Sequence, residues 1–210
     1  MNRTKIALVL TGLFVAAVME AGCASSSGYK QADRTSDQMG GLRDELEKGK
    51  TQISETITAL NDLQGTSNPA AAFESYRKEL RATEALAQRV RKRADEMRKK
   101  GAEYFKAWEK QLEELSSDDL RRRASERRTD LLAAFDRISE ASQALTEAYG
   151  PLMDDLTDIE TFLSADLTPA GISTISDVIK KAGQDAAVVN KHIDAVIQQI
   201  DDTVAKFGQK

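Results

Sequence analysis

The feature that most constrains this chain is a spacing of apolar residues that alternates between three and four positions. The spacing continues through four runs, which extend from Leu42 to Leu63, from Phe73 to Leu115, from Leu131 to Leu163 and from Ile172 to Phe207. Steps of three and four place these side chains on one helix face, and persistence over several heptads is typical of coiled coils and helical bundles. No run shows the alternation of a strand. The sequence therefore predicts an all-α fold.

Turn and capping residues separate the four runs. The segment GTSNP at 65–69 interrupts the first run, and SSDD at 116–119 offers hydroxyl caps and acids for a new first turn. Thr168 can cap a helix that has Pro169 at its first position. We therefore predict helices at about residues 35–63, 70–115, 118–164 and 169–207.

Pro151 lies inside the third predicted helix, where proline removes one backbone hydrogen bond. The apolar spacing continues past it, so we expect a bend and not a domain boundary. Short connections make consecutive helices antiparallel. Both outer helices join the longer central pair at the end away from the 116–119 turn. We expect an elongated antiparallel four-helix coiled-coil bundle over residues 35–207, from which the central helical hairpin protrudes as a finger.

The first 22 residues have the composition of a bacterial signal peptide. Arg3 and Lys5 precede an apolar run from Ile6 to Met19, which is too short to span a bilayer. The run ends in Glu-Ala-Gly-Cys, which resembles the lipobox of bacterial lipoproteins, although Glu20 stands where that pattern prefers an apolar residue. The sequence predicts a lipoprotein signal peptide at 1–22.

Cys23 is the only cysteine, so it cannot form a disulfide within one chain. By the lipobox resemblance, the chain is cut after Gly22 and Cys23 is acylated, and more than one acyl chain gives stable anchoring. The small and polar residues that follow predict a flexible tether at 23–34. Ala24 resembles the residue that directs Gram-negative lipoproteins to the outer membrane. The alternative is a plain secretory signal that is cut near Ala24.

Two segments carry a resemblance to a known family. They are AEYFKAWEKQLEELSSDDLRRRASERRTDLL at 102–132 and PLMDDLTDIETFL at 151–163. They resemble the bacterial lipoproteins of domain-of-unknown-function family 2959 (DUF2959), which share a tryptophan-centred helix, a polar turn, a Leu-Arg-Arg stretch and a later proline. The resemblance covers most of residues 28–205. It implies a secreted helical lipoprotein, and it brings no activity because none is assigned to the family.

The residues for the usual chemistry of helical bundles are missing from this sequence. Di-iron bundles need two Glu-x-x-His pairs, but His192 is the only histidine and Val189 stands three positions before it. We expect His192 to be solvated, one position from the apolar face at Ile193. The sequence has no glycine-rich phosphate loop and no Cys/His metal spacing. We therefore expect no enzymatic activity, no metal and no cofactor.

Basic residues concentrate between 89 and 128, where 14 Lys or Arg face nine Asp or Glu. Ion pairs on a solvated rod are one interpretation of this concentration. The other is a contact surface for anionic lipid, glycan or an acidic partner. Its candidate residues at the tip of the hairpin are Arg121, Arg122, Arg123, Arg127 and Arg128.

Three aromatic residues lie near this basic segment. Tyr104 and Trp108 fall on the apolar face, so we expect them in the core, with Arg127 near the indole. Phe105 lies beside that face and is the residue that we expect to be exposed. Phe105, together with Trp108 close to it in the helix, completes the candidate contact surface.

These expectations describe a non-enzymatic, lipid-anchored lipoprotein on the periplasmic face of the outer membrane, which acts as a helical interaction or structural module. A membrane-surface or curvature-binding module and a helical bundle with a buried small-ligand site are the alternatives. The expected partners are the membrane, through the lipid, and a protein or anionic lipid at the hairpin tip. A location outside the cytoplasm excludes nucleic acid. A homo-oligomer and attachment of Lys210 to peptidoglycan stay open.

Overall fold

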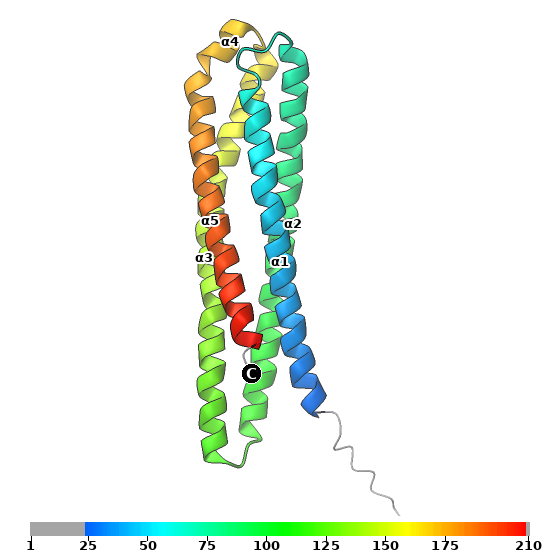
Figure 1. Ribbon diagram of the computed structural model, residues 1–210, viewed down its shortest axis with the longest axis vertical. Coiled ribbons are helices and arrows are strands. Elements are labelled where there is room, and N and C mark those ends of the chain that lie inside the picture. Colours follow the sequence, from blue (N-terminus) through cyan, green and yellow to red (C-terminus); the bar gives the residue numbers. More distant parts are fainter. Residues whose placement is uncertain (1–23, 209–210) are drawn as a thin grey trace, which may run out of the picture.

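The computed structural model describes residues 24–208, which form five α-helices and no strand. The helices are α1 (Ala24–Asn61), α2 (Pro69–Glu113), α3 (Asp118–Ala165), the short α4 (Pro169–Thr174) and α5 (Ser176–Gly208). The four long helices lie side by side along an elongated rod, and α4 lies at one of its ends (Figure 1). The predicted all-α class is confirmed for the described residues.

Three helices begin at a side-chain cap, and the sequence predicted two of these caps, at 116–119 and at Thr168. The side chains of Asn68, Ser117 and Thr168 accept hydrogen bonds from backbone N–H groups three positions ahead, at 3.2, 3.4 and 3.0 Å. Each bond satisfies one of the N–H groups that have no partner within the helix. The α1–α2 connection contains Gly65, whose φ of 80° is in the left-handed region that favours glycine. Local side-chain chemistry therefore sets these helix boundaries.

The first helix begins earlier than predicted, and this corrects the expected tether. Residues 24–34 are helical and continue into the rest of α1. The apolar spacing extends back from Leu42 through Met39 to Thr35, and the last two side chains are buried at 0% and 1% exposure. Because these residues pack in the core, they hold the preceding turns in helical register. The small polar residues after Cys23 are thus not evidence of a tether.

The predicted fourth helix is two helices, with a break at Ile175. The N–H of Ile175 bonds to the Ile172 carbonyl at 3.4 Å, which closes a tighter turn than that of an α-helix. Both isoleucines are buried, at 5% and 8% exposure. The break lets the chain turn at the end of the rod while both side chains stay in the core. In contrast, α3 continues through Pro151 as one helix.

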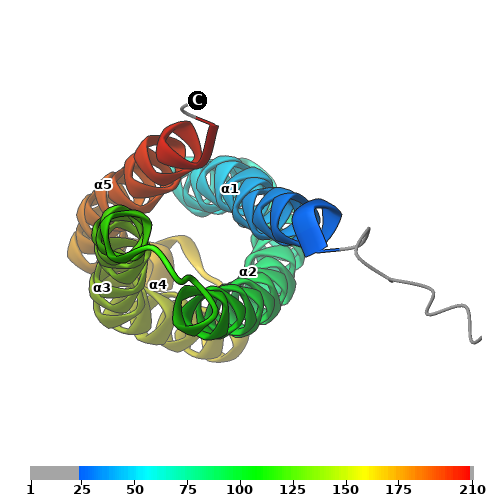
Figure 2. The same cartoon turned by 90° about the horizontal axis from the view of Figure 1, so that it is seen from below.

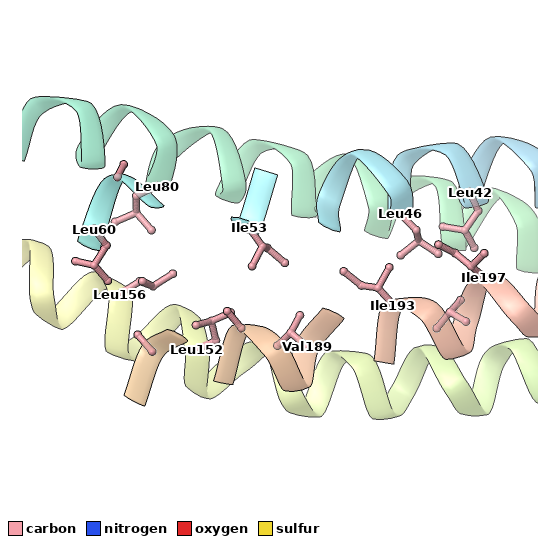
Figure 3. Close-up of a cluster of buried hydrophobic side chains, with 14 of the residues drawn as sticks. Leu42, Leu46, Ile53, Leu60, Leu80, Leu152, Leu156, Val189, Ile193 and Ile197 are labelled. Carbon is pink, nitrogen blue, oxygen red and sulfur yellow. The ribbon is translucent and has the colours of Figure 1, made fainter. Parts of the chain in front are cut away.

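The core is a continuous row of buried apolar side chains along the axis of the rod. Figure 3 shows Leu46 and Ile53 of α1 facing Val189 and Ile193 of α5 across its middle. All buried residues of the described part lie between Thr35 and Thr203. A chain that starts at residue 24 therefore contains this whole core and has what it needs to fold.

The start of α1 and the α2–α3 turn lie at the same end of the rod (Figure 1). The helix α5 ends before this turn, where Phe207 packs on Tyr104 with ring centroids 5.5 Å apart. Beyond that contact the ends of α2 and α3 continue together as a helical finger (Figure 1). Since α2 has 45 residues and α1 has 38, α2 extends about 10 Å further than α1 at 1.5 Å per residue.

Candidate contact surface

The predicted anchor residue, Cys23, and the predicted signal peptide lie outside the described residues. The described part begins directly after Cys23, with α1. None of the helices in residues 24–208 is long and apolar enough to cross a membrane. The same residues contain no group of three or more His, Cys, Asp or Glu placed to hold a metal ion.

The three consecutive arginines at the start of α3 are engaged in ion pairs within their own helix. Arg121 pairs with Asp118 at 2.9 Å, Arg122 with Asp119 at 2.8 Å and with Glu126 at 3.0 Å, and Arg123 with Asp119 at 2.8 Å. Exposed pairs of this kind contribute only about 0–1 kcal/mol each. They nevertheless balance the charge of the turn, because residues 109–128 contain six Lys or Arg and six Asp or Glu.

The next two arginines connect helices. Arg128 Nε donates to the Phe105 carbonyl at 3.2 Å, and its guanidinium pairs with Glu109 at 3.4 Å. Arg127 donates to the Lys206 carbonyl at 3.2 Å and so connects α3 to α5, rather than covering the indole of Trp108. These two side chains therefore hold the helices of the finger together.

Phe105 is buried at 4% exposure, so the expectation that it is exposed was wrong. Its ring packs against that of Phe135 in a T-shaped arrangement, with the ring centroids 5.8 Å apart. The reason is Gly101, one turn earlier in α2. A Cβ on Gly101 would lie 2.2 Å from Phe135 Cζ, so the glycine leaves the space that the Phe135 ring occupies. Gly101 on the apolar face is the sequence signal that could have predicted this arrangement.

Tyr104 and Trp108 form the rest of this aromatic cluster. Their rings meet at 5.6 Å, and both side chains are half-buried. Burial raises the pKa of the Tyr104 hydroxyl, while nearby Arg127 lowers it. The cluster packs the finger against the end of α5, so Trp108 offers only part of its ring to a partner.

The excess positive charge lies on α2 and not at the turn. Residues 89–108 contain eight Lys or Arg and only three Asp or Glu. Lys92, Lys99, Lys106 and Lys110 are exposed and have no ion pair among the described residues. Their spacing of seven, seven and four places them within about 40° of one another on the helix. We call these four residues the lysine row, which sequence reasoning missed although the spacing was visible.

Two acids beside the lysine row are bonded to other side chains, whereas Glu113 and Glu114, just after Lys110, make no ion pair among the described residues. Glu103 pairs with Lys100 at 2.8 Å, which lowers the pKa of the Glu103 carboxyl, and Glu96 pairs with Arg93 at 3.3 Å. The row is therefore a cationic surface about 27 Å long at 1.5 Å per residue, with unpaired carboxylates only at its Lys110 end.

Two large apolar side chains are exposed at the end of the rod that holds the α2–α3 turn. Leu120, in the first turns of α3, is 56% exposed, and Tyr29, in α1, is 75% exposed. Seen along the axis, the start of α1 and the α2–α3 turn both face the viewer at this end (Figure 2). The end of the rod thus combines apolar side chains with the nearby cations Lys106 and Lys110.

Residues 22–207 match the model of a family described as "Protein of unknown function (DUF2959)". The comparison with curated proteins found no match. The comparison with solved structures also found none.

Proposed function

Because the chain belongs to the DUF2959 family, we propose that it is a lipid-anchored, non-enzymatic module of the bacterial cell envelope that acts by contact. The family match begins at Gly22, one residue before Cys23, and so excludes nearly all of the predicted signal peptide. This boundary supports cleavage after Gly22 and acylation of Cys23. In this proposal the protein stands on the periplasmic face of the outer membrane, with its four long helices packed as a coiled coil.

One observation carries the proposal: the start of α1 and the α2–α3 turn lie at the same end of the rod (Figure 1). With Cys23 in the membrane, the helix that follows places the rod directly on the lipid surface. The exposed Tyr29 and Leu120 then reach the interface, where an aromatic residue with a polar group is favoured. Burial of one leucine side chain in the membrane contributes about 1.5–3 kcal/mol to the free energy of binding.

Electrostatic attraction supports the same orientation. Lys106 and Lys110 lie about 10 and 5 Å before the end of α2 at Glu113, at 1.5 Å per residue, which is within about one Debye length at 0.1 M salt. Each cation near an anionic surface contributes about 1 kcal/mol to the free energy of membrane binding. The arginines at 121–123 can also turn toward lipid phosphates, but they first leave the carboxylates that now bind them.

The anchor is tested by Cys23→Ala, with Ser26→Ala as the matched control. The Cys23 variant should move from the membrane fraction to the soluble periplasmic fraction, while the control stays with the membrane. A Cys23→Ala protein that remains membrane-bound at low and high salt would show that the lipid is not the anchor.

The orientation is tested with residues 24–210 and lipid vesicles. Leu120→Ser should weaken binding to neutral and anionic vesicles alike, by roughly tenfold or more, because it removes apolar contact. Lys106→Gln with Lys110→Gln should weaken only anionic binding at low salt. Lys180→Gln with Lys191→Gln, on α5, is the charge-matched control and should change neither.

Replacement of the three arginines at 121–123 by glutamine is a second test of the electrostatic contribution. It leaves Asp118, Asp119 and Glu126 without their cations, so it should also weaken binding to anionic vesicles. Equal binding of every variant to both vesicle types would refute the membrane contact and leave the lipid as the whole attachment.

A further inference from the structure

The middle of the rod is open on the side between α2 and α3. No residue of α2 between Leu86 and Met97 is buried, and none of α3 between Ile138 and Leu152. Leu145, which falls within the third apolar run, is therefore only half-buried. On the opposite side, α1 and α5 remain packed, with Leu46 and Ile193 buried at 2% and 3% exposure.

A cavity of about 80 Å³ lies behind this opening, and its walls are mostly apolar. It is lined from all four long helices, including Leu46, Ile53, Leu86, Tyr149, Val189 and Ile193. A wider groove of about 600 Å³ continues from it between α2 and α3 and shares Leu46, Val90 and Leu145 with it. Leu46, Ile53, Val189 and Ile193, which line the cavity, point toward the interior of the rod (Figure 3). The groove falls in the usual range of small-ligand sites, about 300–1,000 Å³.

Two polar groups accompany these apolar side chains. The Tyr149 hydroxyl is buried and has no hydrogen-bond partner among the described residues. Burial raises the pKa of this hydroxyl to about 12, so it is a proton donor at neutral pH. Arg91 lines both the cavity and the groove and makes no ion pair within residues 24–208. A buried donor without an acceptor costs free energy, and an acceptor between these two groups would satisfy both.

The other charges in the groove restrict where an anion can lie. Arg98 is bonded to Asp95, so neither is free. Glu140 lies in the groove but not in the cavity, and it would repel an anion placed beside it. Beside the effect of burial, the charge of Arg91 lowers the pKa of the Tyr149 hydroxyl and the charge of Glu84 raises it. The position between Tyr149 and Arg91 is thus the one that favours a single negative charge.

We propose that this groove binds one alkyl chain that ends in a carboxylate, that is, a fatty acid. The carboxylate accepts hydrogen bonds from the Tyr149 hydroxyl and from the Arg91 guanidinium. The alkyl chain lies along the groove, against the apolar side chains of Leu42, Leu46, Val90 and Leu145. From Thr83 to Arg98 the site extends about 22 Å along the rod at 1.5 Å per residue, which accommodates an extended chain. This site is separate from the contact surface at the end of the rod.

The test uses residues 24–210, which contain the whole core and carry no acyl chain, in calorimetric titrations with dodecanoate below its micelle concentration. We expect saturable binding of one molecule per chain. Each methylene removed from the chain should weaken binding roughly fourfold, which corresponds to about 0.8 kcal/mol. The trimethylammonium compound with the same chain should bind at least roughly tenfold more weakly, since it offers no acceptor. Equal binding of the anionic and cationic compounds would overturn the proposal.

Variants identify the site. Arg91→Gln and Tyr149→Phe should each weaken dodecanoate binding, the first by roughly tenfold or more because a charge-assisted bond is lost. Lys92→Gln removes the adjacent exposed cation and should leave binding unchanged. An effect of Lys92→Gln as large as that of Arg91→Gln would show that only general charge attraction is measured.

A plug variant gives a test that does not depend on charge. Gly49 lines the cavity, and a Cβ there would meet nothing within 4 Å, so Gly49→Leu should fill the space and abolish binding. Gly40→Leu, also on α1 but outside the cavity, is the matched control and should bind normally. Circular dichroism melting establishes that both variants fold. Unchanged binding by a folded Gly49→Leu protein, or a dimer that closes the groove and excludes dodecanoate, would contradict the proposal.

Discussion

Gly101→Ala tests the packing of the finger onto the rest of the rod. The new Cβ would lie 2.2 Å from Phe135 Cζ and 2.7 Å from Cε1 and Cε2 of the same ring. The Phe135 ring is 5% exposed and packs against Phe105 in a T-shaped arrangement, so it has little room to move. Overpacking of this kind costs about 1–3 kcal/mol, while alanine in place of glycine inside a helix contributes about 1 kcal/mol. We expect a net loss of about 0–2 kcal/mol in the free energy of unfolding, in contrast to a gain at an unobstructed glycine.

Urea denaturation followed by circular dichroism measures this loss in residues 24–210. Gly40→Ala is the matched control, because a Cβ at Gly40 meets nothing within 4 Å, and it should stabilise by up to about 1 kcal/mol. In a Phe135→Leu background the ring is gone, so Gly101→Ala should become neutral or stabilising. The reasoning is refuted if Gly101→Ala stabilises the wild-type protein as much as Gly40→Ala does.

The same substitution should have opposite effects at two tyrosines. Tyr76→Phe should cost about 1 kcal/mol, because the buried Tyr76 hydroxyl donates a hydrogen bond to the Leu156 carbonyl at 2.6 Å. Tyr149→Phe should stabilise the protein by about 1 kcal/mol, because it removes a buried hydroxyl that has no partner among the described residues. Urea midpoints that shift in the same direction for the two variants would contradict both expectations. The raised pKa of Tyr149 means that the unfolded chain loses this proton first, so stability should fall between about pH 10 and 12, and less steeply in Tyr149→Phe. Ile138→Ala should cost about 2–5 kcal/mol because its side chain is fully buried, and a midpoint shift no larger than that of exposed Glu140→Ala would show a wrong register.

The helices were predictable because their signals are local. Caps such as Ser117 and Thr168 act on N–H groups three positions away, and apolar spacing extends over many turns. The early start of α1 was not predicted because the small polar composition of residues 24–34 is typical of a flexible segment. The apolar spacing, which continues back to Met39 and Thr35, was the better signal. The break at Ile175 was missed because it depends on how the chain turns at the end of the rod.

The candidate sites were harder to predict because they depend on pairs of helices. The burial of Phe105 follows from the space that Gly101 leaves for a ring on another helix. The arginines at 121–123 are neutralised by carboxylates that the sequence shows but does not orient. The opening beside Tyr149 exists because α2 and α3 both lack buried residues at the same height along the rod. The apolar spacing within each helix does not predict this opening.

The orientation of the rod on the membrane is the central claim, and a depth measurement tests it most directly. In the full-length protein with Cys23 acylated, a nitroxide is attached at Leu120→Cys or at Ser67→Cys and the protein is placed in bilayers. The loop that holds Ser67 follows the far end of α1, about 57 Å from its start at 1.5 Å per residue. We predict that the label at 120 collides with lipid-dissolved oxygen and that the label at 67 stays in water. Equal accessibility of the two labels, or a label at 67 closer to the lipid, would contradict the account.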